Sequence, residues 1–127
     1  MLSKRLSLPF RDTRTHWLDI QESIRLIEAF LAGHDFEKYR SDPLVKSAVE
    51  RQMQIISEAA VRLGPKAEGK CPGLDWKGLR GMGNVLRHAY HRIVDRIVWD
   101  AVKEDLPLLK ACVDQILDVR EADQNTQ

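Results

Sequence analysis

The chain has 127 residues, of which 43% are hydrophobic and 31% are charged, and its formal net charge is +1. This length suits a single domain with one core. The near-neutral balance excludes a uniformly basic nucleic-acid coat protein and an acidic, disordered tail protein.

Cysteine content and hydropathy exclude further classes of protein. Cys71 and Cys112 are the only cysteines, too few for a disulfide framework or a four-thiolate zinc site. No apolar run reaches the length of a membrane span, and the first residues lack the apolar region of a signal peptide. We therefore expect one domain over residues 1–127, located in the cytoplasm, with no membrane association.

Helical periodicity begins near residue 15, and no stretch shows the alternation of a strand. Apolar residues recur at three- and four-residue spacings from Trp17 to Leu31. Thr13 or Thr15 is available as the N-cap, and Gly33 as the stop signal. This pattern predicts a first helix of about four turns.

A second helix is expected between a clear start signal and a clear stop signal in the sequence. Ser41-Asp42-Pro43 has the form of an N-cap followed by a proline in the first turn. The apolar pattern then continues to Leu63 and ends at Gly64-Pro65. Residues 64–75 contain three glycines and two prolines, which predicts a loop.

A third helical stretch covers about residues 76–93 and contains Gly78, Gly81 and Gly83. Each glycine costs about 0.5–1 kcal/mol relative to alanine in a helix interior. We therefore expect a short first turn, a break, and a regular helix from about Gly83 onward.

The last helical stretches follow closely. Asp95 is a candidate N-cap for a fourth helix, and Asp105-Leu106-Pro107 restarts it with an apolar stripe that reaches Leu117. The resulting fold class is all-α, an antiparallel bundle of four to five helices with a core over about residues 15–119. The tail, residues 120–127, is expected to fray. A bundle this small could also bury an apolar face against a second copy.

The small net charge conceals an uneven distribution of charge along the chain. Residues 1–16 have a net charge of +3, residues 17–76 of −2, residues 77–98 of +4, and residues 99–127 of −4. The +4 segment would favour a ligand that carries phosphate. The alternative is a solvated helix face paired with the acidic C-terminal segment.

The basic segment also gathers the side chains best suited to chemistry. Arg80, Asn84, His88, His91 and Asp95 are spaced so that, on one unbroken helix, they share a face. Such a face would carry a guanidinium, an amide, two imidazoles and a carboxylate, which are costly to bury without partners. It is therefore expected to line a cleft or to face water.

Three interpretations of this face compete. His88, His91 and Asp95 could hold a metal ion, but no set of acidic ligands accompanies them on another helix. Alternatively, His88 could act as the general acid or base of metal-free RNA cleavage, with Arg80 or Arg87 stabilising charge on the phosphate. The third interpretation is a solvated polar surface without a ligand.

The sequence of this segment adds a family resemblance. Trp76, followed by Gly81-Met-Gly-Asn-Val-Leu-Arg-His-Ala-Tyr90, resembles the HepT-like signature Gly-Met-Arg-Asn-x-Leu-x-His-x-Tyr of the HEPN superfamily. Residues 55–63 and 105–109 are similar to the family's middle and closing helices, so the resemblance covers about residues 15–117. HepT-like proteins are the toxin halves of HepT–MNT toxin–antitoxin pairs.

The resemblance implies a homodimer of helical bundles that cleaves RNA without a metal or other cofactor, at a cleft on the two-fold axis. His88 would be the acid or base, Asn84 a positioning group, and Arg80 or Arg87 the phosphate clamp. The implied partner is a small nucleotidyltransferase of the MNT type, the antitoxin, which would transfer AMP to Tyr90 and block RNA binding through bulk and negative charge.

One position departs from the family pattern, because Gly83 stands where the family has its catalytic arginine. Arg80 is the nearest upstream arginine, with seven residues between it and His88, and on an unbroken helix these eight steps place the two Cα atoms about 12 Å apart along the axis. Arg87, or an arginine of a second subunit, could serve instead. Two hypotheses follow: a HepT-type ribonuclease with a relocated arginine, and a HEPN binding module that docks a nucleotidyltransferase or RNA without cleaving.

Overall fold

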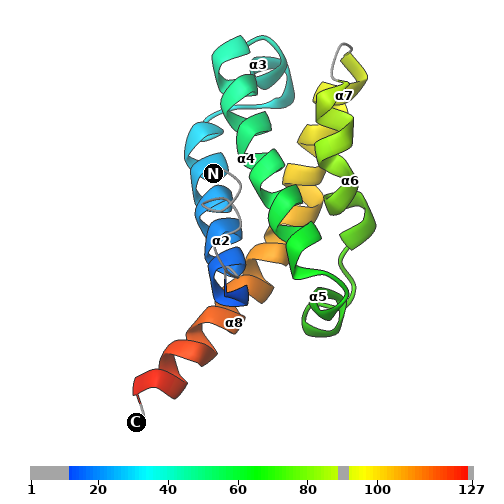
Figure 1. Cartoon of the computed structure of the whole chain (residues 1–127). Helices are drawn as coiled ribbons and strands as arrows, with labels where there is room; N and C mark the ends of the chain where they lie inside the picture. The colour runs from blue at the N-terminus through cyan, green and yellow to red at the C-terminus, as the bar shows by residue number, and fades with distance from the viewer. Residues whose placement is uncertain (1–11, 89–91, 126–127) are drawn as a thin grey trace, which may run out of the picture.

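The computed structural model describes residues 12–88 and 92–125, and all regular structure within these ranges is helical (Figure 1). The all-α class expected from the sequence is therefore confirmed. The elements in chain order are α2 (Thr13–Phe30), α3 (Phe36–Arg40), α4 (Pro43–Leu63), α5 (Lys66–Lys70), α6 (Trp76–Arg87), α7 (Arg92–Asp100), the π-helix η1 (Ala101–Asp105) and α8 (Leu106–Asn125).

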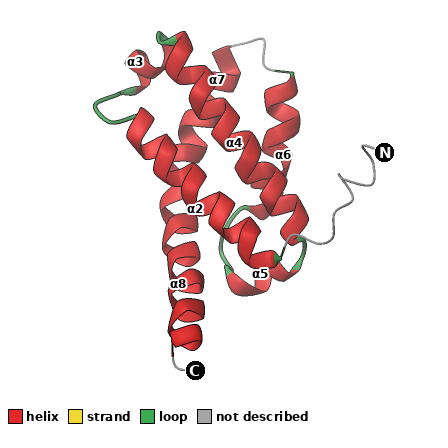
Figure 2. Ribbon diagram, turned by 60° about the vertical axis from the view of Figure 1, so that its left-hand side comes forward, coloured by secondary structure: helices red, strands yellow, loops and turns green. Residues whose placement is uncertain are grey.

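The long helices form a bundle in which α4 lies between α2 and α6 (Figure 1). The chain from α7 through η1 into α8 crosses behind these three helices, and the C-terminal half of α8 extends beyond them (Figure 2). The helices bury apolar stripes against one another, and the core includes Trp17, Ile20, Ile24, Met53, Ile56, Leu79, Leu109 and Val113.

Side-chain caps define where the two longest N-terminal helices begin. Asp42 is the N-cap of α4, as expected, and its carboxylate accepts a hydrogen bond from the backbone N–H of Val45 at 3.1 Å. The expected threonine N-cap of α2 is wrong. Asp12 takes that position, and its carboxylate accepts a hydrogen bond from the N–H of Arg14 at 3.2 Å.

The glycine-rich α6 differs from the sequence expectation. It is one unbroken helix from Trp76 to Arg87, so the predicted break before Gly83 is wrong, and the helix ends well before residue 93. Asp75 caps it by accepting a hydrogen bond from the N–H of Gly78 at 2.9 Å, and a Cβ at Gly78 would collide with that carboxylate. The Asp75 cap therefore needs this glycine, and its cost to the helix is offset by the cap.

Three further element boundaries differ from those expected from the sequence. The segment 64–75 is not loop throughout, because it contains the short helix α5. α7 begins at Arg92, so Asp95 lies in its first turn and is not its N-cap. The π-helix η1 joins α7 to α8 without a loop, and α8 continues to Asn125.

A single disulfide ties the end of α5 to α8. Cys71 and Cys112 are bonded across 41 residues, with their Cα atoms 6.0 Å apart. The sequence excluded a disulfide framework but did not predict this bridge. Within the described ranges, the helices are too short or too polar to cross a membrane.

Candidate functional site

Helix α6, which carries the motif, is fixed at its N-terminal end by tryptophan packing. Trp76 is buried, and its indole N–H donates a hydrogen bond to the carbonyl of Cys71 at 2.9 Å. Its ring meets that of Trp17 on α2 edge to face, with centroids 6.1 Å apart. The register of α6 against the core is therefore set at its first residue.

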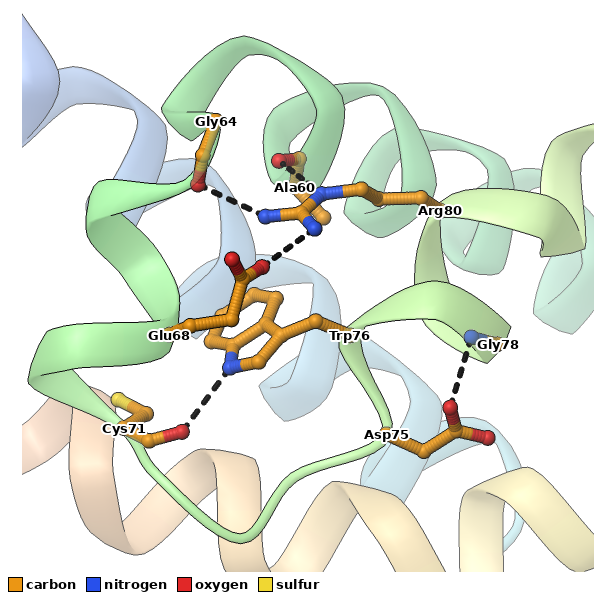
Figure 3. Close-up of polar contacts among 8 residues, drawn as sticks. All are labelled: Ala60, Gly64, Glu68, Cys71, Asp75, Trp76, Gly78 and Arg80. Atoms are coloured by element: carbon orange, nitrogen blue, oxygen red, sulfur yellow. Dashed lines mark hydrogen bonds and ion pairs between the residues drawn. The ribbon is translucent and has the colours of Figure 1, made fainter.

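Arg80 is engaged at this same end of the helix (Figure 3). Its guanidinium donates hydrogen bonds to the carbonyls of Ala60 at 3.1 Å and Gly64 at 2.7 Å. It also forms an ion pair with Glu68 of α5 and lies over the Trp76 ring, 5.6 Å from the centroid. Arg80 thus adds a second donor to each of two carbonyls at the C-terminal end of α4, which also accept from the backbone N–H groups of Gly64 and Ala67.

Gly83 faces α4 at the middle of the helix. Its N–H donates a hydrogen bond to the Ser57 hydroxyl oxygen at 3.0 Å, and that hydroxyl donates to the Arg80 carbonyl at 2.8 Å. A Cβ placed on Gly83 would lie 3.1 Å from Ser57 Oγ and 3.3 Å from Arg87 Nη2. The guanidinium of Arg87 therefore reaches back one turn and lies against the space that Gly83 leaves open.

The C-terminal end of α6 presents polar side chains to solvent. His88 is the C-cap residue, and its backbone N–H donates to the carbonyl of Val85 at 3.2 Å. The side chains of Asn84, Arg87 and His88 are all exposed. An amide, a guanidinium and an imidazole thus occupy the last turn of one helix, a set able to bind a phosphate and transfer a proton.

The single polar stripe expected from the sequence does not form, because the helix stops at Arg87. Asp95 lies on α7, buried, with Lys46 Nζ of α4 at 2.9 Å from its Oδ1. Asp95 thus belongs to an inter-helix ion pair and not to the exposed end of α6. His91 and Tyr90 lie outside the described residues.

The Asp95–Lys46 pair belongs to a wider buried polar group between α3, α4 and α7. Burial, together with the negative charges of Glu50 and Asp95, raises the pKa of Tyr39. The pKa of Glu50 is also raised, mainly by burial, although Lys46 opposes the shift. Among the residues that the structure describes, no group of three metal-ligating side chains converges.

Sequence reasoning named both Arg80 and Arg87 as candidates but did not predict how the surroundings of the two arginines differ. The partners of Arg80 are mainly backbone carbonyls of α4, which a residue pattern does not display. The sequence did contain a signal for the position of the Arg87 side chain. Gly83 precedes Arg87 by four residues, so the two positions are neighbours on the helix surface. The structure places Arg87 with His88, and Arg80 at the opposite end of α6.

Comparison with known proteins identifies the family. The model of the ribonuclease HepT-like family matches residues 20–116, more than half of the chain. The chain belongs to the HepT-like family. The resemblance seen in the α6 motif is thereby confirmed.

Individual relatives of this HepT-like chain carry names that agree with the family. A Thermococcus cleftensis protein named "Probable ribonuclease HepT" is 35% identical over 100 residues, covering 79% of this chain and 91% of that protein. A Methanocaldococcus jannaschii protein named "Putative RNase MJ1380" is 32% identical over 100 residues, covering 79% of this chain and 92% of that protein. No solved structure matches the chain significantly.

Proposed function

We propose that this HepT-like chain is a metal-independent endoribonuclease, the toxin of a toxin–antitoxin pair. His88 is its general acid or base, Arg87 its phosphate clamp and Asn84 its positioning group. One observation supports this assignment best. Arg87 Nη2 lies 3.3 Å from the position that a Cβ would occupy if residue 83 were not glycine. The guanidinium of Arg87 therefore lies beside the position from which the family's arginine would extend.

The chemistry needs only groups that this end of α6 carries. The 2′-hydroxyl of the RNA attacks the adjacent phosphorus while an imidazole takes its proton. The bond to the 5′-oxygen then breaks, and that oxygen leaves with a proton supplied by an acid. Negative charge grows on the phosphate oxygens in between, and a guanidinium stabilises it through paired N–H donors.

Partners are part of the same proposal. The active form is a homodimer, and a nucleotidyltransferase antitoxin of the MNT type inhibits it by transferring AMP to Tyr90. Tyr90 follows Arg87, the last residue of α6, by three residues and follows His88 by two. An added nucleotide there would place negative charge beside the phosphate-binding groups and repel RNA.

The experiment is RNA cleavage by the purified, partner-free chain in excess EDTA, beside a His88→Ala variant. The wild type is expected to cleave RNA, and His88→Ala to be inactive with its stability changed by less than about 1 kcal/mol, because the side chain is exposed. Arg51→Ala is the control for loss of an exposed polar side chain outside α6. A folded, unmodified wild type that binds RNA or the antitoxin without cleaving would instead indicate the binding module that Gly83 first suggested.

A further inference from the structure

The short helix α5 and the turn that follows it have few apolar contacts of their own. Among residues 66–73, only Ala67 and Cys71 are buried. Pro65, at the N-cap position of α5, has no side-chain acceptor with which to cap this helix of five residues. A helix of this length is not stable alone in water, and a segment with few buried contacts opens at a low cost in free energy. The segment therefore depends on its links to the rest of the bundle.

The disulfide between Cys71 and Cys112 is the covalent link of this segment to α8. Cys71 is buried, whereas Cys112 is only partly buried. Thiol–disulfide exchange needs access of a thiolate to one of the two sulfurs, and the Cys112 side of the bond offers that access. The bond that holds the segment is thus open to reduction in the folded chain.

The same segment contacts the N-terminal end of α6 at two points (Figure 3). The carbonyl of Cys71 accepts the hydrogen bond of the Trp76 indole N–H, at 2.9 Å. Glu68 forms an ion pair with Arg80, one turn further along α6. Release of α5 would therefore remove the acceptor of a buried N–H and a partner of the Arg80 guanidinium, and both losses weaken the anchoring of α6.

From Arg80, a series of contacts continues toward the other end of α6. The Arg80 carbonyl accepts a hydrogen bond from the Ser57 hydroxyl at 2.8 Å, and the hydroxyl oxygen accepts one from the N–H of Gly83 at 3.0 Å. The guanidinium of Arg87 lies beside Gly83, one turn further on. Because α6 is one unbroken helix from Trp76 to Arg87, a shift of its first turns would also displace the last turn with its polar side chains.

We propose that the Cys71–Cys112 disulfide is a redox switch of the candidate site at the end of α6. With the bond formed, α5 holds the first turns of α6 and the site is active. With the bond reduced, α5 separates from α6 and RNA cleavage falls. This inference rests on the ribonuclease of the proposed function and adds a form of regulation to it.

The reductant that the switch requires is a dithiol. One thiolate of the dithiol attacks the sulfur of Cys112 and forms a mixed disulfide, while Cys71 leaves as a thiolate and takes up a proton. The second thiol of the reductant then attacks the reductant's own sulfur in the mixed disulfide, and Cys112 leaves and becomes a thiol. The protein disulfide gains two electrons and two protons, and the dithiol that supplies them is oxidised to a disulfide.

The first test follows hydrogen exchange of backbone N–H groups by mass spectrometry in the full chain, without RNA, before and after addition of dithiothreitol. After reduction, α6 is expected to exchange faster by about tenfold or more, an effect in the range that a crosslink of this kind has on opening. Residues 20–30 of α2 are expected to keep their rates. Unchanged exchange in α6, or equal acceleration in α2, would overturn the switch.

The matched control is Cys71→Ser with Cys112→Ser. Exchange in α6 of this double variant is expected to equal that of the reduced wild type and to be indifferent to dithiothreitol. A response of the double variant to the reductant would show that the reductant acts elsewhere and would overturn the switch. The comparison of oxidised with reduced wild type does not depend on the folding of this variant.

The second test measures RNA cleavage by the wild type in excess EDTA, oxidised, reduced with dithiothreitol, and reoxidised. Reduction is expected to lower the rate by about tenfold or more, because a misplacement of about 1 Å is enough for such a loss. Reoxidation is expected to restore the rate. A cleavage rate indifferent to reduction would overturn the proposed regulation.

These outcomes are separate from those for the proposed function. Cleavage at the same rate in both redox states would reject the switch and keep the ribonuclease. A chain that never cleaves RNA would reject the ribonuclease, and the exchange of α6 would then decide alone whether the disulfide controls the helix.

Discussion

The two arginines of α6 lie in different surroundings. Arg80 binds two backbone carbonyls and Glu68, and its side chain is 26% exposed. Arg87 is exposed and adjoins His88. The first is expected to support the fold, and the second the chemistry.

Alanine substitutions separate these roles. Arg87→Ala should lower RNA cleavage by about 100-fold or more, the usual loss for one preorganised donor to a developing anion, with little change in stability. Arg80→Ala should lower the free energy of unfolding by about 1–3 kcal/mol, because two carbonyls at the end of α4 each lose one donor and Glu68 loses its ion pair. Denaturant titration and initial cleavage rates measure both. Arg80→Ala with native stability and no cleavage would reverse the assignment.

The proximity of Gly83 and Arg87 predicts that the charge can be moved back to the family position. Arg87→Ala removes the guanidinium from beside Gly83, and the closest remaining atom to a Cβ at position 83 is then Ser57 Oγ, at 3.1 Å. The double variant should recover a substantial part of the cleavage lost in Arg87→Ala. A folded double variant with no recovery would show that the two positions are not interchangeable.

At the scale of the elements, the polar group between α3, α4 and α7 makes stability depend on pH. The pKa of Glu50 is raised from its ordinary 4.5, so the folded chain retains a proton that the unfolded chain releases. Its contribution to stability is therefore complete below pH 4.5 and is lost as the pH rises through the raised value.

Glu50→Gln removes this titration. The variant should be more stable than the wild type at neutral pH, and the difference should vanish toward pH 4. Denaturant titrations of both proteins across this range measure it. A variant less stable than the wild type at neutral pH would show that the attraction of Lys46 outweighs burial.

Element boundaries were predictable where a side chain marks them locally. Asp42 and Pro43 indicated the start of α4 correctly, because cap and proline act on the adjacent backbone. The unbroken α6 was not predictable, since glycine propensity ignores the cap that Asp75 gives to Gly78. The continuous passage from α7 into α8 depends on a π-helix, for which the apolar period gives no signal.

At the scale of the whole molecule, the disulfide connects two elements that are far apart in the sequence. α5 is a helix of five residues, and Cys71 at its end is bonded to Cys112 of α8. A crosslink that closes a loop of this size stabilises a domain by about 2–4 kcal/mol.

Cys71→Ser with Cys112→Ser should therefore lower the free energy of unfolding by about this amount. Denaturant titration should show the loss, and a reductant should reproduce it in the wild type. Equal stability of the wild type with and without reductant would indicate that the bond adds nothing to the fold.

Fold class and family could be read from the sequence because both depend on local patterns, the apolar period and the α6 motif. The different surroundings of Arg80 and Arg87 could not, since they depend on carbonyls of α4 and on the side chains around Gly83. The same limit applied to Asp95. Its predicted place on a shared polar stripe required one helix through residue 95, whereas α6 ends at Arg87.

The central claim is that the RNA is cleaved without a metal, by its own 2′-hydroxyl with His88 as the acid or base. The most direct measurement identifies the ends of the RNA products formed in excess EDTA, by mass spectrometry, for the wild type and for His88→Ala. The account predicts 2′,3′-cyclic phosphate and 5′-hydroxyl ends from the wild type and no product from His88→Ala. Products with 5′-phosphate and 3′-hydroxyl ends, or equal cleavage by both proteins, would contradict it.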